Sequence, residues 1–320
     1  METIPSTVLP ELKLEAWEQS KITLNLYLQI VGKIQLALMP RKNHWWNITF
    51  LVNAKGLVTH TMPAGDRAFE IQFNFLEHKL EIFTCNGLYK TCNGLYKSFP
   101  LENGLSVADF YKKLFAILAE LNITVKMTPR QFGLPEEHPI QTPFFELTQF
   151  NSYDPVYVQR FWQILVWTSE VFNEFGGRFY GKTSPVQLFW HHMDMTVTRF
   201  CGRRAPQLPK TTNISNKDAY SHELISFGFW AGDEKTREAA YYSYTYPSPK
   251  GLDKEPLEPA AAKWVDSNGS PMALLMYDDV RTSENPREAL LAFLESCYIA
   301  GAKLSGWDIA DLKVSSLKEM

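Results

Sequence analysis

The order of periodic segments is the feature of this sequence that most constrains its fold. A helical pattern over residues 14–38 precedes a run of short alternating segments, and a second helical pattern over residues 105–121 closes that run. The same order recurs after residue 153, with helical patterns over 156–175 and 285–304 on either side of further alternating segments. Helices that flank antiparallel strands predict an α+β protein, in which the helices pack on one face of each sheet.

The recurrence predicts two units, residues 1–128 and 154–320, joined by an extended connector over 129–153 that contains four prolines. Trp46 and Trp190 occupy corresponding places in the two runs, which favours a divergent internal duplication over a chance similarity of order. We therefore expect two pseudo-repeated helix, antiparallel sheet, helix units packed together. Ligand sites in such pairs are expected where the two units meet.

A shorter repeat, TCNGLYK, is copied once over residues 84–97. Seven residues cannot form a repeat fold, which needs three or more larger units to bury a core. Each copy contains Asn-Gly, a strong signal for a hairpin turn, so we expect the copy to lengthen a hairpin tip or to form a loop. We assign it no function.

The composition excludes several classes of function. The 320 residues are 45% hydrophobic and 14% aromatic, enough to bury a large core. A net charge of -3 with only short basic clusters argues against a nucleic acid partner. The first residues lack the basic start and apolar run of a secretory signal, and no apolar stretch reaches the roughly 18 residues of a membrane helix. We expect a soluble, cytoplasmic protein without a membrane partner, whose four cysteines are reduced thiols.

Several short motifs are distinctive. They are HWW at 44–46, SP at 184–185, FW at 189–190, VTRFCGRRAP at 197–206, AYSHE at 219–223, GFW at 228–230 and PAAAKW at 259–264. Together they resemble an uncharacterised, mainly bacterial family catalogued as domain of unknown function 5996, from Trp17 to Trp307. The resemblance implies no activity. The residues that match the family pattern are Asp194, Arg199, Arg203, Arg204, His222 and Glu223, whereas small residues often stand at the positions of His191 and His192.

One candidate site would bind a metal. His192 and Asp194 are two residues apart, so on a strand their side chains would share a face. With His222 they would form the two-histidine, one-carboxylate set that holds iron in some oxygenases. The alternative is that His192 is an ordinary side chain on a strand surface, and the departure from the family pattern at this position argues against the metal set.

A second candidate site would bind an anion and transfer protons. His222 is suited to acid–base catalysis near neutral pH, and we predict His222 and Glu223 as the catalytic residues. Arg199, Arg203 and Arg204 have guanidinium donors suited to a carboxylate or a phosphate, or alternatively they pair with acidic residues of the sheet. The predicted ligand-binding residues are His44, Trp45, Trp46, Trp190, Asp194, Arg199, Arg203, Arg204, Tyr220 and Trp230.

The aromatic residues suggest the walls of such a site. In YYSYTYP, residues 242, 244 and 246 share one face of a strand and present three tyrosines there. The sequence thus predicts a protein that binds a small, anionic organic molecule in an aromatic pocket, lined by Arg and His, between the two units. Whether it is an enzyme is left open, and so is any cofactor. Two alternatives remain: a non-catalytic interaction protein that self-associates as a homo-oligomer through its aromatic surface, and a metal-dependent, oxygenase-like enzyme.

Overall fold

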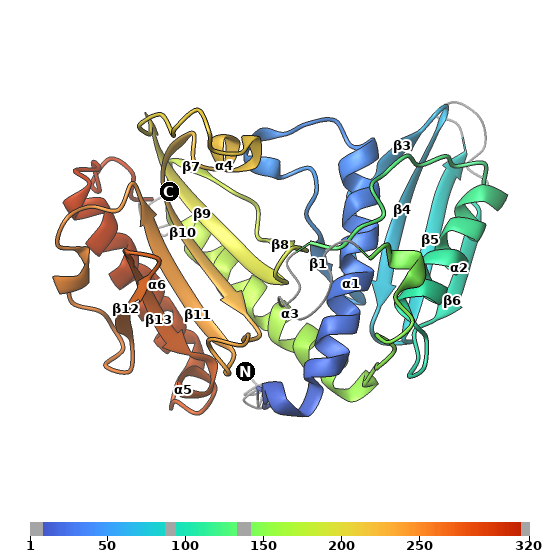
Figure 1. The fold of residues 1–320 in the computed structure, drawn as a ribbon. Coiled ribbons are helices and arrows are strands. Elements are labelled where there is room, and N and C mark those ends of the chain that lie inside the picture. The colour runs from blue at the N-terminus through green and yellow to red at the C-terminus, as the bar shows by residue number, and fades with distance from the viewer. Residues whose placement is uncertain (1–8, 87–93, 133–141, 315–320) are drawn as a thin grey trace, which may run out of the picture. The chain divides into compact units, whose positions relative to one another are not determined.

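The computed structural model describes residues 9–86, 94–132 and 142–314 (Figure 1). Two compact units emerge from the contacts within the chain. The N-terminal unit comprises residues 15–162 and 187–194, and the C-terminal unit comprises residues 1–14, 163–186 and 195–320. The boundaries expected from the sequence, at 128 and 154, stay a prediction.

An antiparallel sheet with helices on one face forms the N-terminal unit. The sheet has the order β1-β2-β4-β5-β6, with β3 paired to β4. Tyr27 of α1 stacks on Phe110 of α2 at 4.1 Å between ring centroids, and Phe110 in turn stacks on Phe73 of β4. The elements are α1 (Leu14–Leu38), η1 (Asn43–Trp45), β1 (Leu51–Asn53), β2 (Gly56–Val58), β3 (Met62–Ala64), β4 (Arg67–Asn74), β5 (Lys79–Asn86), β6 (Tyr96–Pro100), α2 (Val107–Glu120), η2 (Phe144–Glu146) and β8 (Gln187–Phe189).

The C-terminal unit has the same kind of architecture, with strands in the order β12-β13-β11-β10-β9-β7 (Figure 1). Phe175 of α3 packs edge-on against Phe227 of β10, and α6 contacts β10 and β11 from the same side. The elements are α3 (Pro155–Gly177), β7 (Lys182–Thr183), β9 (Asp194–Arg204), α4 (Ile214–Ala219), β10 (His222–Trp230), β11 (Ala240–Tyr246), η3 (Leu252–Lys254), β12 (Lys263–Ser267), β13 (Ser270–Met276), α5 (Tyr277–Arg281) and α6 (Pro286–Leu304).

The α+β class predicted from the sequence is confirmed, and the internal duplication stays a prediction. Side-chain caps mark the starts of the long helices α2 and α6. Ser106 accepts a hydrogen bond from the backbone N–H of Asp109, and Asn285 does the same for Glu288. The sequence analysis did not predict β6, β7, β12 or the short helices α4 and α5.

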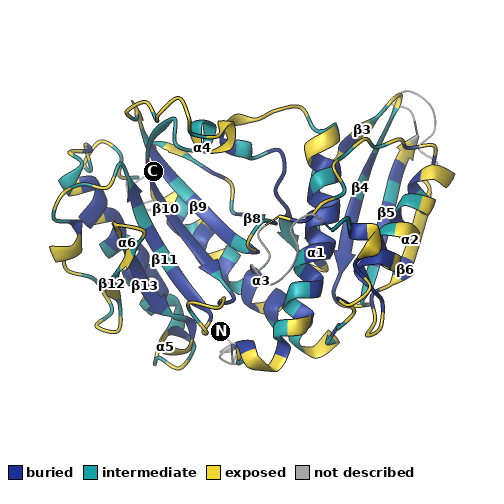
Figure 2. Ribbon diagram, in the orientation of Figure 1, coloured by how far each residue is buried: buried dark blue, intermediate teal, exposed yellow. Residues whose placement is uncertain are grey.

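Strand alternation in β11 separates the face that packs on the helices of the unit from the opposite face. Tyr241 points to the helices, because its hydroxyl lies 3.0 Å from that of Thr168 on α3. Tyr242, Tyr244 and Tyr246 therefore point to the other face of the sheet. Figure 2 shows buried residues along the strands and on the helix sides that face them, which is where the core of each unit lies.

The segment around His191 and His192 differs from the prediction. The sequence analysis placed His192 on a strand, but β8 ends at Phe189 and residues 190–193 form a turn. Met193 has a φ of 57°, a left-handed conformation that reverses the chain before β9 begins at Asp194. Because His192 lies in the turn and only Asp194 lies on a strand, the alternation of strand side chains does not place the two on one face.

The duplicated peptide falls on the connection between β5 and β6. These strands pair antiparallel up to Phe83 and Tyr96, and residues 87–93 lie outside the described residues. Among the described residues, no helix is long and apolar enough to cross a membrane.

Candidate functional site

The HWW motif forms a tight turn in the N-terminal unit, between α1 and β1. His44 and Trp45 have φ angles of 54° and 63°, which are uncommon for residues with large side chains. The His44 ring is buried, with its centroid 5.3 Å from that of Trp46. These three predicted ligand-binding residues therefore lie together in one turn.

The buried side-chain amide of Gln35 forms hydrogen bonds to the backbone that follows this turn. The side chain of Gln35 on α1 donates a hydrogen bond to the carbonyl of Thr49 at 3.0 Å and accepts one from the N–H of His60 at 3.0 Å. The Thr49 hydroxyl donates to the side-chain oxygen of Gln187 on β8 at 2.9 Å. The amide thus satisfies polar backbone groups that would otherwise be costly to bury.

Trp190 anchors the turn that follows β8. Its side chain is buried against Gly32 of α1, where a Cβ atom would lie 2.3 Å from the indole ring. The His191 ring stacks on the indole with centroids 3.7 Å apart. The Lys33 ammonium lies 6.0 Å from the centroid of the Trp190 ring. Burial, with smaller effects of His192 and Lys33, lowers the pKa of His191 to about 4. His191 is therefore neutral at neutral pH.

The structure does not bring the predicted metal set together. His192 is exposed on the turn, Asp194 begins β9, and His222 begins β10 in the C-terminal unit. Within the described ranges, no three His, Cys, Asp or Glu side chains are grouped so that they could hold a metal ion.

Two of the predicted arginines contact groups on the helix-covered side of the C-terminal sheet. Arg199 is buried, and its guanidinium lies over the rings of Phe175 on α3 and Tyr298 on α6. Arg203 donates to Glu223 Oε2 at 2.6 and 3.0 Å, and also to the carbonyl of Ser305 at the end of α6. The indole N–H of Trp307 reaches the same Glu223 oxygen at 3.1 Å. Both guanidinium groups thus connect strand β9 to the helices that cover the sheet.

The face of the C-terminal sheet opposite helices α3 and α6 carries a row of aromatic side chains, which we call the tyrosine face. It consists of Trp230, Tyr242, Tyr244 and Tyr246 from β10 and β11, with Tyr220 beside them. Tyr242 lies across Gly228, where a Cβ would be 2.3 Å from the ring. Tyr220 packs on Tyr246 with centroids 4.6 Å apart.

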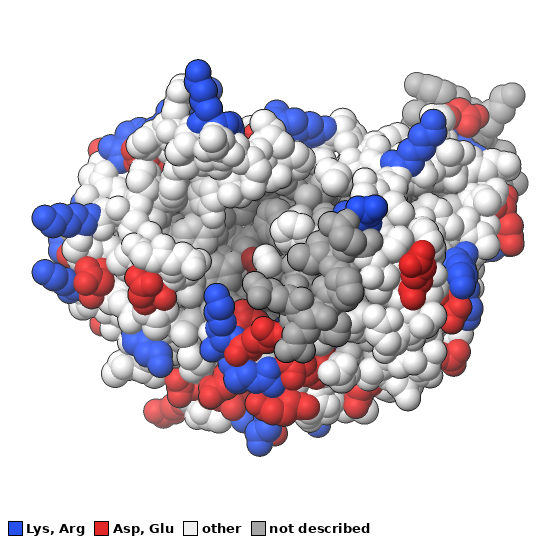
Figure 3. All heavy atoms as spheres, in the orientation of Figure 1, with Lys and Arg blue, Asp and Glu red and all other residues white. Residues whose placement is uncertain are grey.

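Hydroxyl groups lie beside the rings on this face. Ser226 pairs with Thr198 on one side and Tyr244 on the other, and the hydroxyls of Thr198 and Ser226 are 3.1 Å apart. The Tyr220 and Tyr244 hydroxyls are 3.4 Å apart. In Figure 3 mostly uncharged atoms cover β9 and β10, with charged side chains toward the margins. The face therefore offers ring surfaces together with hydrogen-bonding groups.

Basic side chains gather at one end of the tyrosine face. Lys182 of β7 belongs to the cross-strand row that continues through Phe200 and Leu224 to Tyr246, so all four side chains share this face. The Lys182 ammonium lies 4.8 Å over the Phe200 ring. Burial lowers the pKa of Lys182, and the nearby Asp218 carboxylate opposes this effect.

His222 and Arg204 complete this basic end. Arg204 is the cross-strand partner of His222, and the His222 Nδ1 lies 3.1 Å from the Ser221 hydroxyl. Burial lowers the pKa of His222, and the positive charges of Lys182 and Arg204 lower it further. The structure thus brings His222, Arg204 and Tyr220 of the predicted residues to one end of the tyrosine face, whereas Trp230 lies at the other end of β10. The sequence analysis missed Lys182, because no local pattern shows which strand lies beside β9.

These features define an α+β protein built on two antiparallel sheets, each covered by helices on one face. Over residues 9–314 the chain matches the family of unknown function DUF5996, and it belongs to that family. The resemblance drawn from its motifs is thereby confirmed. No curated protein and no solved structure matches the chain.

Proposed function

We propose that the tyrosine face and its basic end bind a small organic anion that carries a flat ring. The observation that carries the proposal is the gathering of Lys182, Arg204 and His222 beside Tyr220 and Tyr246. Positive groups that lower each other's proton affinity are stabilised by an added negative charge. A carboxylate or phosphate at this end would provide it.

Each part of the face has a distinct role in this proposal. Lys182 and Arg204 pair with the anion, and a guanidinium can form two parallel hydrogen bonds to a carboxylate or phosphate. The rings of Tyr220 and Tyr246 pack against the ring of the ligand. His222 contacts the anion, and if the protein is an enzyme, His222 is the group placed to transfer a proton.

The test is calorimetric titration with 4-hydroxybenzoate and with phenyl phosphate. We expect at least one of them to bind, and Lys182→Ala and Arg204→Ala each to weaken its affinity about tenfold. Lys250→Ala is the matched control, since Lys250 is an exposed lysine on the turn after β11. If neither compound binds, or if all three variants bind equally well, the proposal is wrong.

Self-association through the same face is the second candidate, because aromatic side chains are enriched where proteins bind one another. Sedimentation velocity separates the two functions. A monomer at all concentrations excludes self-association, whereas a dimer that is lost in Tyr244→Arg supports it.

A further inference from the structure

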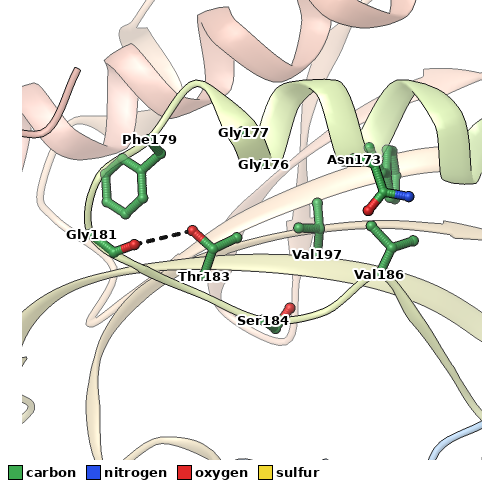
Figure 4. Close-up of a pocket in the computed structure, with 10 residues that line it drawn as sticks. Asn173, Gly176, Gly177, Phe179, Gly181, Thr183, Ser184, Val186 and Val197 are labelled. Atoms are coloured by element: carbon green, nitrogen blue, oxygen red, sulfur yellow. Dashed lines mark hydrogen bonds between the residues drawn. The ribbon is translucent and has the colours of Figure 1, made fainter. Parts of the chain in front are cut away.

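A pocket of about 290 Å³ lies in the C-terminal unit, between the last turns of α3 and the segment from Gly181 to Val186 (Figure 4). Phe172, Phe179 and Val197 supply apolar surface. All of the described residues that line the pocket are uncharged: Phe172, Asn173, Gly176, Gly177, Phe179, Gly181, Thr183, Ser184, Val186 and Val197. A lining of this kind offers no oppositely charged partner to a charged ligand, and it therefore favours an uncharged one.

Gly176, in the last turn of α3, leaves space between the helix and the sheet. A Cβ added to Gly176 would lie 3.6 Å from a methyl group of Thr183 and 3.7 Å from one of Val197, between the helix and the sheet. A Cβ added to Gly177 would meet nothing within 4 Å. A larger side chain at residue 176 would therefore fill the pocket.

Two polar side chains in this lining have hydrogen-bonding capacity left over. Ser184 is buried and its Oγ accepts from the N–H of Thr198 at 2.9 Å, while its own proton goes to no acceptor in the described part of the chain. Asn173 lies at the exposed rim of the pocket and donates from Nδ2 to the carbonyl of Ser169 at 2.8 Å. Because a carbonyl can only accept, this contact fixes the amide orientation and leaves Oδ1 as an acceptor. Figure 4 shows that oxygen turned toward Val197.

We propose that this pocket binds a small uncharged molecule with one apolar ring and a carboxamide group. The ring packs on Phe172, Phe179 and Val197. The carboxamide provides one acceptor and one donor. Its oxygen accepts a hydrogen bond from the Ser184 hydroxyl, and its N–H donates one to Asn173 Oδ1. Ligand pockets commonly range from about 300 to 1,000 Å³, so a pocket near the lower limit suits a single-ring compound.

The probe is benzamide, titrated into the intact protein and followed by NMR of backbone amides. We expect the signals of Thr183 and Ser184 to shift and to saturate. Benzoate has the same shape with a negative charge, and we expect it to shift these signals much less. Ser184→Ala removes the donor and should weaken benzamide binding about fivefold to tenfold.

Gly176→Leu and Glu170→Leu form the matched pair of variants, since Glu170 is an exposed residue of α3 that does not line the pocket. We expect Gly176→Leu to abolish the benzamide shifts and Glu170→Leu to leave the affinity unchanged. If Gly176→Leu does not fold, as judged by circular dichroism, Ser184→Ala decides the question. The proposal is overturned if benzamide shifts no pocket signal, or if Gly176→Leu and Ser184→Ala both bind it like the wild type.

This inference is independent of anion binding at the tyrosine face. Lys182→Ala and Arg204→Ala should leave benzamide binding unchanged, and Gly176→Leu should leave the affinity for 4-hydroxybenzoate unchanged. Either site can therefore fail without affecting the result for the other.

Discussion

The guanidinium carbon of Arg199 lies 3.5 Å from the ring centroid of Phe175, so a strand arginine is stacked on an aromatic ring of α3. The ring of Tyr298 on α6 lies 4.5 Å from the same guanidinium carbon. A carboxylate oxygen of Glu295 lies 3.8 Å from an Arg199 guanidinium nitrogen. Burial lowers the pKa of Arg199 to about 10, which still leaves the group charged at neutral pH. Rings, a carboxylate and a backbone carbonyl together compensate for the lost hydration.

Arg199→Ala should lower the free energy of unfolding by about 3 kcal/mol, because it opens a cavity and removes the buried partner of Glu295. Urea denaturation measures this change. Arg204→Ala on the same strand is the control, and since Arg204 is exposed we expect a change within about 0.5 kcal/mol. Equal effects of the two substitutions would contradict the structural role of Arg199.

His191 should titrate far below an ordinary histidine. Its pKa is lowered from 6.5 to about 4 by burial first, so the folded protein binds this proton less readily than the unfolded chain does. The stabilising contribution of the neutral ring is therefore complete above pH 6.5 and is lost as the pH falls toward 4. NMR of the imidazole signals measures the pKa directly, and His191→Gln should flatten the pH dependence of stability in this range. The exposed His192 is the control, since His192→Gln should leave that dependence in place.

Gly32→Ala and Gly177→Ala should change stability in opposite directions, although both replace a helical glycine. At Gly32 the new Cβ would lie 2.3 Å from Trp190, so the indole must move and we expect a loss of about 2 kcal/mol. At Gly177 the new Cβ meets nothing within 4 Å, so the lower backbone entropy of the unfolded chain should stabilise the protein by about 0.5 kcal/mol. Thermal unfolding of the two variants compares them. A stabilised Gly32→Ala would show that Trp190 is not packed on α1.

Anion binding at the tyrosine face should strengthen as the pH falls. The pKa of His222 is lowered by burial and then by Lys182 and Arg204, so the ring is neutral at neutral pH and gains a charge on acidification. A bound anion favours the charged form, and the affinity therefore rises as the ring takes up its proton. Titration calorimetry of 4-hydroxybenzoate at several pH values tests this expectation. His222→Gln should remove the dependence, and its persistence in that variant would assign the effect to another group.

Local sequence signals were sufficient to predict the four long helices of this protein. Ser106 and Asn285 mark helix starts because their side chains bond to backbone N–H groups only three residues away. Asp154 acts in the same way, accepting from the N–H groups of Val156 and Tyr157 at the start of α3. Alternation likewise placed three tyrosines on one face of β11. Such interactions involve neighbouring residues, so a single sequence contains the information.

The contacts of each strand side chain depended on residues that are distant in sequence, and local patterns did not predict them. Arg199 and Arg204 look equivalent in the motif, yet one contacts Phe175 and Tyr298 and the other is paired with His222. A shift of one residue in the pairing of β9 would exchange the two faces, and no local pattern sets that register. The turn at residues 190–193 shows the same limit, because the packing of Trp190 on Gly32 involves residues more than 150 positions apart in the chain.

The sequence by itself determined the α+β class, the ends of the long helices and the family to which the chain belongs. The tertiary structure decided which polar residues share a face: Lys182 with Tyr246, and Glu223 with Arg203 and Trp307. The physical reason is that helix formation and capping depend on hydrogen bonds within a few residues, whereas the neighbours across a sheet are chosen by the packing of the whole unit.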